Sequence, residues 1–112
     1  MSQGKRESAG NDEMLWAAAA PLLAGPGVER GTMMGSACVR VHGEFAAMVH
    51  VKTGELIVKL SEPRVIALAA AGAGERFAPN GRVFRQWLAV PPDRFDQWSG
   101  LIGEAVALAH KK

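Results

Sequence analysis

One short segment carries side chains with the chemistry of metal ligands. Cys38 and His42 lie in the run ACVRVH with Arg40 between them, so in an extended strand all three point to the same face. A thiolate and an imidazole both bind zinc, but a zinc site takes at least three protein ligands. Because a third ligand is missing, we predict ordinary strand residues here and no metal or cofactor.

Two further sequence features resemble catalytic or phosphate-binding elements. His50 is predicted beside Ile57 across a hairpin, where no acid or nucleophile accompanies it. The run GAGE at 72–75 follows a predicted helix and lacks the further glycine and the lysine of a phosphate-binding loop, so it predicts a helix end. We therefore expect a protein that is not an enzyme.

Arg85 and Trp87 form the strongest candidate site, because both fall on one side of a predicted strand over residues 83–90. An exposed tryptophan flanked by arginine is typical of a protein-interaction hot spot or of a base-stacking platform. The alternative is that Trp87 packs under a helix or loop. Arg82 and Lys59 complete the candidate interaction surface, although solvated basic side chains are the default reading.

The predicted sheet is organised around residues 37–60, which read as three consecutive antiparallel strands. Thr53-Gly54 predicts a two-residue hairpin turn, since glycine supplies the positive φ that such turns require. The register that follows is Lys52 opposite Glu55, Val51 opposite Leu56, Val49 opposite Val58 and Ala47 opposite Leu60.

The hairpin over residues 37–49 leaves two registers open. A two-residue turn at His42-Gly43 pairs Arg40 with Phe45, whereas a three-residue loop over 42–44 pairs Val39 with Ala47. Turn chemistry favours the first register and the hydrophobic pattern favours the second. A β-bulge that shifts the phase would reconcile them.

The remaining elements follow from capping residues and periodicity. Residues 1–10 predict a disordered tail, and residues 11–112 a single domain. Helices are expected from an N-cap at Asn11 to about Ala20, from Ser61 to Gly72, and after Pro92 to the C-terminus. A short strand is expected at 75–78, and residues 29–36 as an approach to the sheet, with Met33 and Met34 filling gaps in the core.

The helix residues carry expectations about packing. Val65, Ile66 and Leu68 should supply the buried side of the second helix. Gly100 and Gly103 each cost the last helix about 1 kcal/mol relative to alanine, which predicts close packing there by the sheet or by a second copy of the chain. The order is helix, three strands, helix, two strands, helix, which predicts an α+β fold with helices on one face of an antiparallel sheet.

The totals restrict the class of protein. With 112 residues, 48% hydrophobic residues and one cysteine, the chain suits one cytoplasmic domain without disulfides. No apolar run approaches the roughly 20 residues that span a bilayer, so no membrane partner is expected. A net charge of +2 is too small to argue for nucleic acid by itself.

The chain resembles the TfoX/Sxy N-terminal-domain family over roughly residues 12–109. Met33-Met34-Gly35, Lys59-Leu60 at a strand end and Trp87 with Val90-Pro91 stand in the order of that family's motifs. The resemblance implies an α+β fold like that of secretion-chaperone and YjbR-like proteins, in a bacterial group linked by name to competence regulation. It implies no active site. A competence regulator of this name has a second, C-terminal domain, and we expect this chain to hold only the first.

These observations favour a small cytoplasmic domain that binds another protein or itself, as a homodimer through the sheet edge or the last helix. The alternative is a nucleic-acid-binding module that uses Arg85, Trp87 and the neighbouring basic residues. A small-ligand or weak enzymatic site ranks third.

Overall fold

The protein forms an α+β fold, as the sequence predicts. The computed structural model describes residues 3–33 and 35–111, with side chains from residue 10 onward. The helices are α1 (Gln3–Ala19), α2 (Glu62–Ala70) and α3 (Phe95–His110), and the strands are β1 (Val28–Met33), β2 (Ser36–Val41), β3 (Glu44–Val49), β4 (Leu56–Lys59), β5 (Glu75–Phe77) and β6 (Phe84–Val90). Short 3-10 turns occupy Ala20–Leu22, Pro79–Gly81 and Pro92–Arg94.

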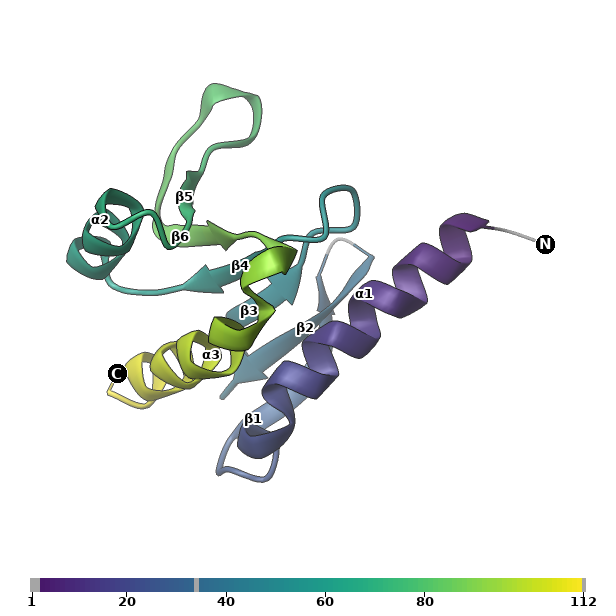
Figure 1. The fold of residues 1–112 in the computed structure, drawn as a ribbon. Coiled ribbons are helices and arrows are strands. Elements are labelled where there is room, and N and C mark those ends of the chain that lie inside the picture. Colours follow the sequence, from purple (N-terminus) through teal and green to yellow (C-terminus); the bar gives the residue numbers. More distant parts are fainter. Residues whose placement is uncertain (1–2, 34, 112) are drawn as a thin grey trace.

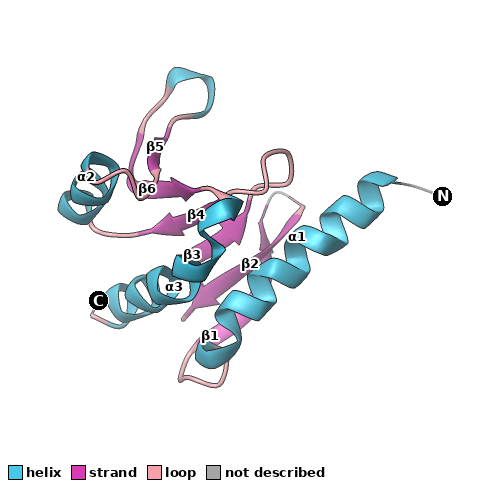
Figure 2. Ribbon diagram, in the orientation of Figure 1, coloured by secondary structure: helices cyan, strands magenta, loops and turns pink. Residues whose placement is uncertain are grey.

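The strands form one antiparallel sheet in the order β1-β2-β3-β4-β6-β5. All three helices lie on one face of it, with α3 between α1 and α2 (Figure 1). α1 contacts β2 and β3, α3 contacts β3 and β4, and α2 contacts β6 and β5. The opposite face has no helix, as the colouring by secondary structure makes clear (Figure 2).

The main core fills the space between the helices and the sheet. Trp98 of α3 is its largest fully buried side chain, and its indole Nε1 donates a hydrogen bond to the Pro91 carbonyl at 3.2 Å. The strands contribute alternate residues to this core: Val39, Val41, Ala47, Val49, Leu56, Val58, Leu88 and Val90. This alternation leaves the intervening residues on the helix-free face.

β1 is a strand that the sequence analysis treats only as an approach to the sheet. It pairs with β2 over its whole length, from Val28 opposite Val41 to Met33 opposite Ser36. The side chain of Arg40 lies against Gly31, where an added Cβ would be 3.0 Å from its Cδ and Nε. The Arg40 guanidinium thereby donates a hydrogen bond to the Thr32 carbonyl at 2.9 Å, so the missing side chain at Gly31 lets it cross the strand.

The hairpin between β2 and β3 combines both predicted registers through a bulge. His42 and Gly43 have φ of 51° and 84°, which is the geometry of a two-residue turn with two left-handed residues. Arg40 pairs with Phe45, but Val39 pairs with Ala47, because the register shifts between Val39 and Arg40. The prediction that a bulge reconciles the alternatives is confirmed.

The predicted register of the β3–β4 hairpin is wrong by two residues. Val49 pairs with Leu56 and Ala47 with Val58, and the His50 amide donates to the Glu55 carbonyl at 2.8 Å. Residues 51–54 therefore form a four-residue loop in which Gly54 has φ of 74°. Glycine has the predicted positive φ, but Lys52 does not face Glu55. A slip of two residues keeps the buried face unchanged.

Val51 is the residue whose predicted burial differs most from the structure because of this register error. The predicted register buries Val51 opposite Leu56, whereas the side chain is 48% exposed in the loop. Val49 is 3% exposed, as predicted.

The N-terminal helix begins earlier than predicted. α1 starts at Gln3, so Asn11 lies inside the helix and is not its N-cap. Its side chain donates to the Val51 carbonyl at 3.3 Å. The helix ends at Ala19, just before Pro21, as predicted. The expectation that residues 1–10 take no part in the core stays a prediction, since residues 1–2 lie outside the described range and residues 3–9 are described without side chains.

The other two helices match their predicted ranges but not every predicted contact. Ile66 is 43% exposed, while Val65 is buried. Ser61 precedes α2 without a side-chain cap hydrogen bond. Nothing in the described part of the chain lies within 4 Å of a Cβ added at Gly100, so the sheet does not pack there, and packing by a second copy stays a prediction. At Gly103 the nearest atom is Leu22 Cδ2 at 3.7 Å, an ordinary contact.

Candidate functional site on the helix-free face

A second, smaller core lies on the face of the sheet that no helix covers. Cys38, Met48, Ile57 and Ala89 point to this face and are at most 6% exposed. Side chains from the same face cover them, among them Met33, Phe45, Phe77 and Trp87, which are only partly buried. Met34, also predicted to fill the core, lies outside the described residues.

Aromatic rings make up most of this cover. We call Phe45, Phe77, Phe84 and Trp87 the aromatic roof. Trp87 is at its centre, with ring centroids 4.8 Å from Phe45, 5.7 Å from Phe77 and 4.9 Å from Phe84. Phe45 comes from β3 and Phe77 from β5, so side chains of separated strands lean toward one another over β4 and β6. All four rings keep part of their surface accessible.

An irregularity between β5 and β6 places two of these rings. Arg76 pairs with Leu88, but the next residue, Phe77, pairs with Phe84. The break in alternation brings Phe84 onto the face of Trp87, where the two rings stack with an interplanar angle of 19°. Strict alternation along residues 83–90 would place Phe84 on the side of Leu88 and Val90, away from Trp87, and the irregularity reverses this for Phe84.

Three of the four predicted interaction residues come together at the roof. Lys59 of β4 pairs directly with Trp87 of β6, so their side chains share a face. The guanidinium carbon of Arg82 lies 5.5 Å from the centroid of the Phe84 ring, which is the geometry of a cation–π contact. Arg85 is exposed, but the break in alternation between Phe84 and Trp87 removes the spacing argument that placed it beside Trp87. We call Lys59 and Arg82 the basic rim.

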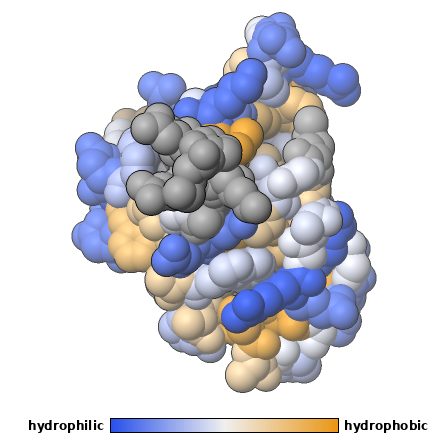
Figure 3. Space-filling view, turned by 90° about the vertical axis from the view of Figure 1, so that its right-hand side faces the viewer, coloured by the Kyte–Doolittle hydropathy of each residue, from blue (hydrophilic) through white to orange (hydrophobic). Residues whose placement is uncertain are grey.

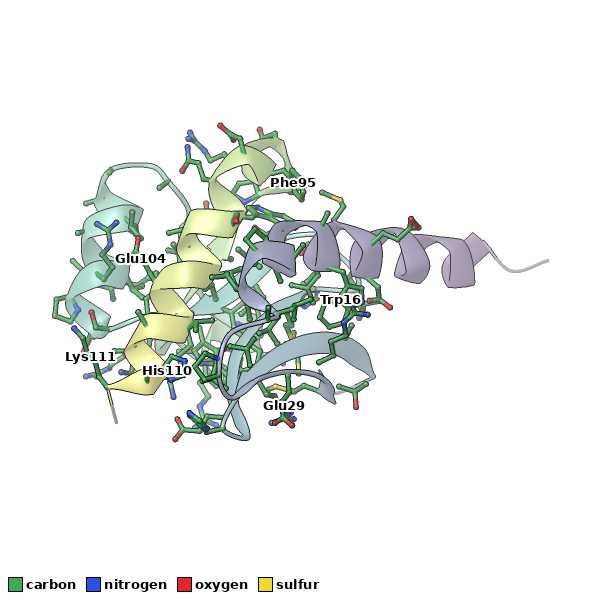
Figure 4. The ribbon with its side chains drawn as sticks, turned by 90° about the horizontal axis from the view of Figure 1, so that it is seen from below. Trp16, Glu29, Phe95, Glu104, His110 and Lys111 are labelled. Carbon is green, nitrogen blue, oxygen red and sulfur yellow. The ribbon has the colours of Figure 1, made fainter. Side chains whose placement is uncertain are left out.

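Cys38 and His42 do not meet. Cys38 is fully buried on the helix-free face, and this burial raises the pKa of its thiol, while the charge of Arg40 acts in the opposite direction. His42 sits in the turn, and its ring contacts the His110 ring near the end of α3 at 5.2 Å (Figure 4 labels His110). Among residues 3–33 and 35–111, no group of three or more His, Cys, Asp or Glu side chains could hold a metal ion.

His50 and the run at 72–75 have structural roles. The Nδ1 atom of His50 accepts a hydrogen bond from the Lys52 amide at 3.2 Å, and its ring lies 6.0 Å from that of Phe77. Gly72 has φ of 80°, and the Ala73 amide donates to the Leu68 carbonyl at 3.0 Å. The values for Gly72 and Ala73 describe a helix that ends at a left-handed glycine, as predicted.

The helix side carries polar features that sequence spacing does not reveal. Arg64 of α2 donates two hydrogen bonds to Glu104 of α3, at 2.9 and 3.0 Å, across a separation of 40 residues. Figure 4 shows Glu104 on the side of α3 that faces α2. The guanidinium of Arg30 lies 4.8 Å from the Trp16 ring. These pairs join α2 to α3 and α1 to β1, and no reactive group accompanies them.

The surface seen from the N-terminal end of α1 differs from the aromatic roof. In this view hydrophobic residues appear as separate orange areas between hydrophilic ones (Figure 3). No broad apolar area is visible there.

Comparison with known proteins assigns no family or function. No family model, no curated protein and no solved structure matches this chain. Within the part of the chain that the structure describes, no helix has the length and apolar character needed to cross a membrane.

Proposed function

We propose that this protein is a small non-enzymatic binding module whose aromatic roof receives a partner protein. The supporting observation is that four aromatic side chains on the helix-free face keep accessible surface beside Lys59 and Arg82. Aromatic residues and arginine are enriched at the energetic centres of protein interfaces. The basic rim favours a partner segment that carries acidic side chains next to apolar ones.

The mutual contacts of the roof support the proposal on energetic grounds. Trp87 already packs against Phe45, Phe77 and Phe84, so little side-chain freedom remains to be lost on binding. Ordering a side chain at an interface costs roughly 0.5–1.5 kcal/mol. A surface that is ordered in advance avoids most of this cost.

The test is photo-cross-linking in native cell extract from two matched positions. Val83, next to Phe84, is 45% exposed, and Ile66, on the outer side of α2, is 43% exposed. A photoreactive residue at Val83 should capture a defined protein, and the same residue at Ile66 should not. Arg82→Glu should abolish the capture, while Arg94→Glu, an exposed arginine before α3, should leave it unchanged. Equal capture from both positions, or capture that survives Arg82→Glu, contradicts the proposal.

A second candidate is single-stranded nucleic acid, and one observation favours it. Phe84 and Trp87 stack at 19° with the Arg82 guanidinium over the Phe84 ring, and bases can stack on aromatic and arginine side chains of this kind. Fluorescence titration with a labelled oligonucleotide at two salt concentrations tests it. Binding should weaken as salt rises, because phosphate contacts release counterions. Absence of binding at low salt removes this candidate.

We also propose membership of the TfoX/Sxy N-terminal-domain family and a cytoplasmic location. The order of Met33-Met34-Gly35, Lys59-Leu60 and Val90-Pro91 along the chain supports the family, and the α+β fold is the one it implies. The free, buried thiol of Cys38 suits a reducing compartment.

The partner protein can also be a second copy of this chain, which would make a homodimer. Light scattering at high concentration tests this: a monomer there excludes self-association.

A further inference from the structure

An open hollow of about 340 Å³ lies at one end of the aromatic roof, between the 51–54 loop and β5. Its wall includes His50, Thr53, Glu55, Glu75 and Phe77, and Ala89 lies in it as well. Phe77 belongs both to this hollow and to the roof. The volume is within the range of roughly 300–1,000 Å³ that is usual for small-ligand sites.

Strand register determines which charged side chains point into the hollow. Glu75 pairs with Ala89, a residue of the helix-free face, so its carboxylate lies on that face. Arg76 pairs with Leu88 of the main core, so its side chain leaves the strand on the other side of the sheet, although Arg76 also borders the hollow. With Glu55, which borders the hollow as well, two carboxylates face this one guanidinium, so negative charge is in excess.

His50 and Glu55 share the same side. The His50 ring contacts Phe77, which places it on the helix-free face. The His50 amide bonds to the Glu55 carbonyl, so the two residues are cross-strand neighbours and their side chains share that face. His50 Nδ1 accepts a hydrogen bond from the Lys52 amide at 3.2 Å, which orients the ring beside Phe77.

The carboxylates of the hollow have no cationic partner within the described residues. The ion pair found there joins Arg64 to Glu104 on the helix side, and neither Glu55 nor Glu75 takes part in one. Two carboxylates that take part in no ion pair of the described residues, in a hollow that an aromatic ring also lines, suit a cation, which is attracted by the carboxylates and by the ring's quadrupole.

We infer that the hollow bounded by Glu55, Glu75 and Phe77 binds an alkylguanidinium or alkylammonium group, presented as an arginine or lysine side chain of the partner protein. The assignment of this cation to a partner protein rests on the proposed function, because Phe77 belongs both to the hollow and to the aromatic roof. The partner segment would then place one basic residue in the hollow and acidic residues beside the basic rim.

Amide NMR of the full-length, ¹⁵N-labelled protein tests the inference with blocked amino acids as probes. Nα-acetyl-arginine methylamide should shift the amides of Thr53, Glu75, Phe77 and Ala89 in a saturable way that weakens with added salt. The citrulline analogue has nearly the same shape without the charge and should not shift them. Free guanidinium ion should bind at least about threefold more weakly than the blocked arginine, because it lacks the alkyl chain that packs on Phe77.

Substitutions separate this site from general charge effects. Glu55→Gln and Glu75→Gln should each weaken binding of the arginine probe by about three- to tenfold, as expected for loss of one charge-assisted contact. Glu29→Gln removes an exposed carboxylate on β1, at the opposite edge of the sheet (Figure 4), and should have no effect. All three variants should keep the melting temperature of the wild type.

Three outcomes overturn the inference: equal shifts with the citrulline analogue, shifts that map outside the hollow, or equal affinity in all three variants. Binding of guanidinium ion as tight as that of the blocked arginine overturns the peptide source. The cross-linking experiment at Val83 reports on the proposed function independently. Failure there with a positive NMR result leaves a cation site without the proposed partner, so the two failures are distinguishable.

Discussion

Two glycine-to-alanine substitutions should change stability in opposite directions. Gly74 is buried just before β5, and a Cβ added there would lie 2.6 Å from the Ala89 carbonyl oxygen and 3.2 Å from Leu88 Cγ. The oxygen belongs to the backbone of β6, so it cannot rotate away as a flexible side chain would. Gly74→Ala therefore pushes β5 away from β6. Gly100 is exposed inside α3 with nothing within 4 Å of the added atom.

The magnitudes follow from these surroundings. Overpacking of this kind costs about 1–3 kcal/mol. Alanine in a helix interior is favoured over glycine by about 1 kcal/mol, so Gly100→Ala should gain that amount. A chain of 112 residues has an unfolding entropy of about 0.24 kcal/mol/K, from roughly 2.1 cal/mol/K per residue. Gly74→Ala should lower Tm by about 4–13 °C, and Gly100→Ala should raise it by about 4 °C.

Thermal and urea unfolding followed by circular dichroism measure both effects. Gly74→Ala should also displace Phe77, so the near-ultraviolet spectrum of the aromatic roof should change in this variant and not in Gly100→Ala. An unchanged Tm for Gly74→Ala would refute the close approach of the 72–75 segment to β6. A lower Tm for Gly100→Ala would refute the open surroundings of that residue and indicate that α3 is covered, for example by a second copy of the chain.

Three further predictions concern the two cores. Val49→Asp should unfold the protein at 25 °C because it buries an unpaired carboxylate, whereas Val51→Asp should keep nearly the wild-type Tm. Equal destabilisation by the two substitutions would support the register predicted from sequence, in which both valines are buried. Trp98→Phe should cost about 2 kcal/mol in urea unfolding, from the lost hydrogen bond to Pro91 and the space left behind, and a neutral result would contradict its tight packing. Burial raises the pKa of Cys38 above its ordinary 9.0, so the thiol of the unfolded chain loses its proton first and the free energy of unfolding should fall as pH rises past that value. In Cys38→Ala the free energy of unfolding should fall less steeply between pH 8 and 10. Equal pH dependence in the two proteins would contradict the burial of the thiol.

Local turn chemistry made much of the sheet predictable. His42-Gly43 favours a left-handed two-residue turn, and the conflict between that turn and the hydrophobic pattern correctly pointed to a bulge. The same approach failed at Thr53-Gly54. Val51 continues the apolar alternation into the loop, so the pattern does not mark the end of β3, which is set by the bond between His50 and Glu55.

The sequence gives weaker signals for features that depend on contacts between distant strands. β1 contains Gly31 and two charged residues, which is a poor strand signal, yet it pairs with β2 because Arg40 fits across the glycine. Trp87 and its basic neighbours were singled out from sequence. Phe45 and Phe77 join them only through the strand order and the irregularity between β5 and β6, neither of which spacing reveals.

The hydrogen bond from Arg40 to Thr32 has a consequence for how this protein avoids aggregation. The His42 amide donates a hydrogen bond to the Gly27 carbonyl, so Gly27 and every second residue after it bond to β2. The backbone groups of the residues between them, Val28, Arg30 and Thr32, therefore point to solvent at the edge of the sheet. Arg40 occupies the carbonyl of Thr32, and the amide of Val28 is already bonded within its own turn. An incoming strand would find the backbone groups at both ends of this edge strand already hydrogen-bonded, and a cationic side chain, Arg30, between them. We expect the edge to resist the templated strand addition that leads to fibrils.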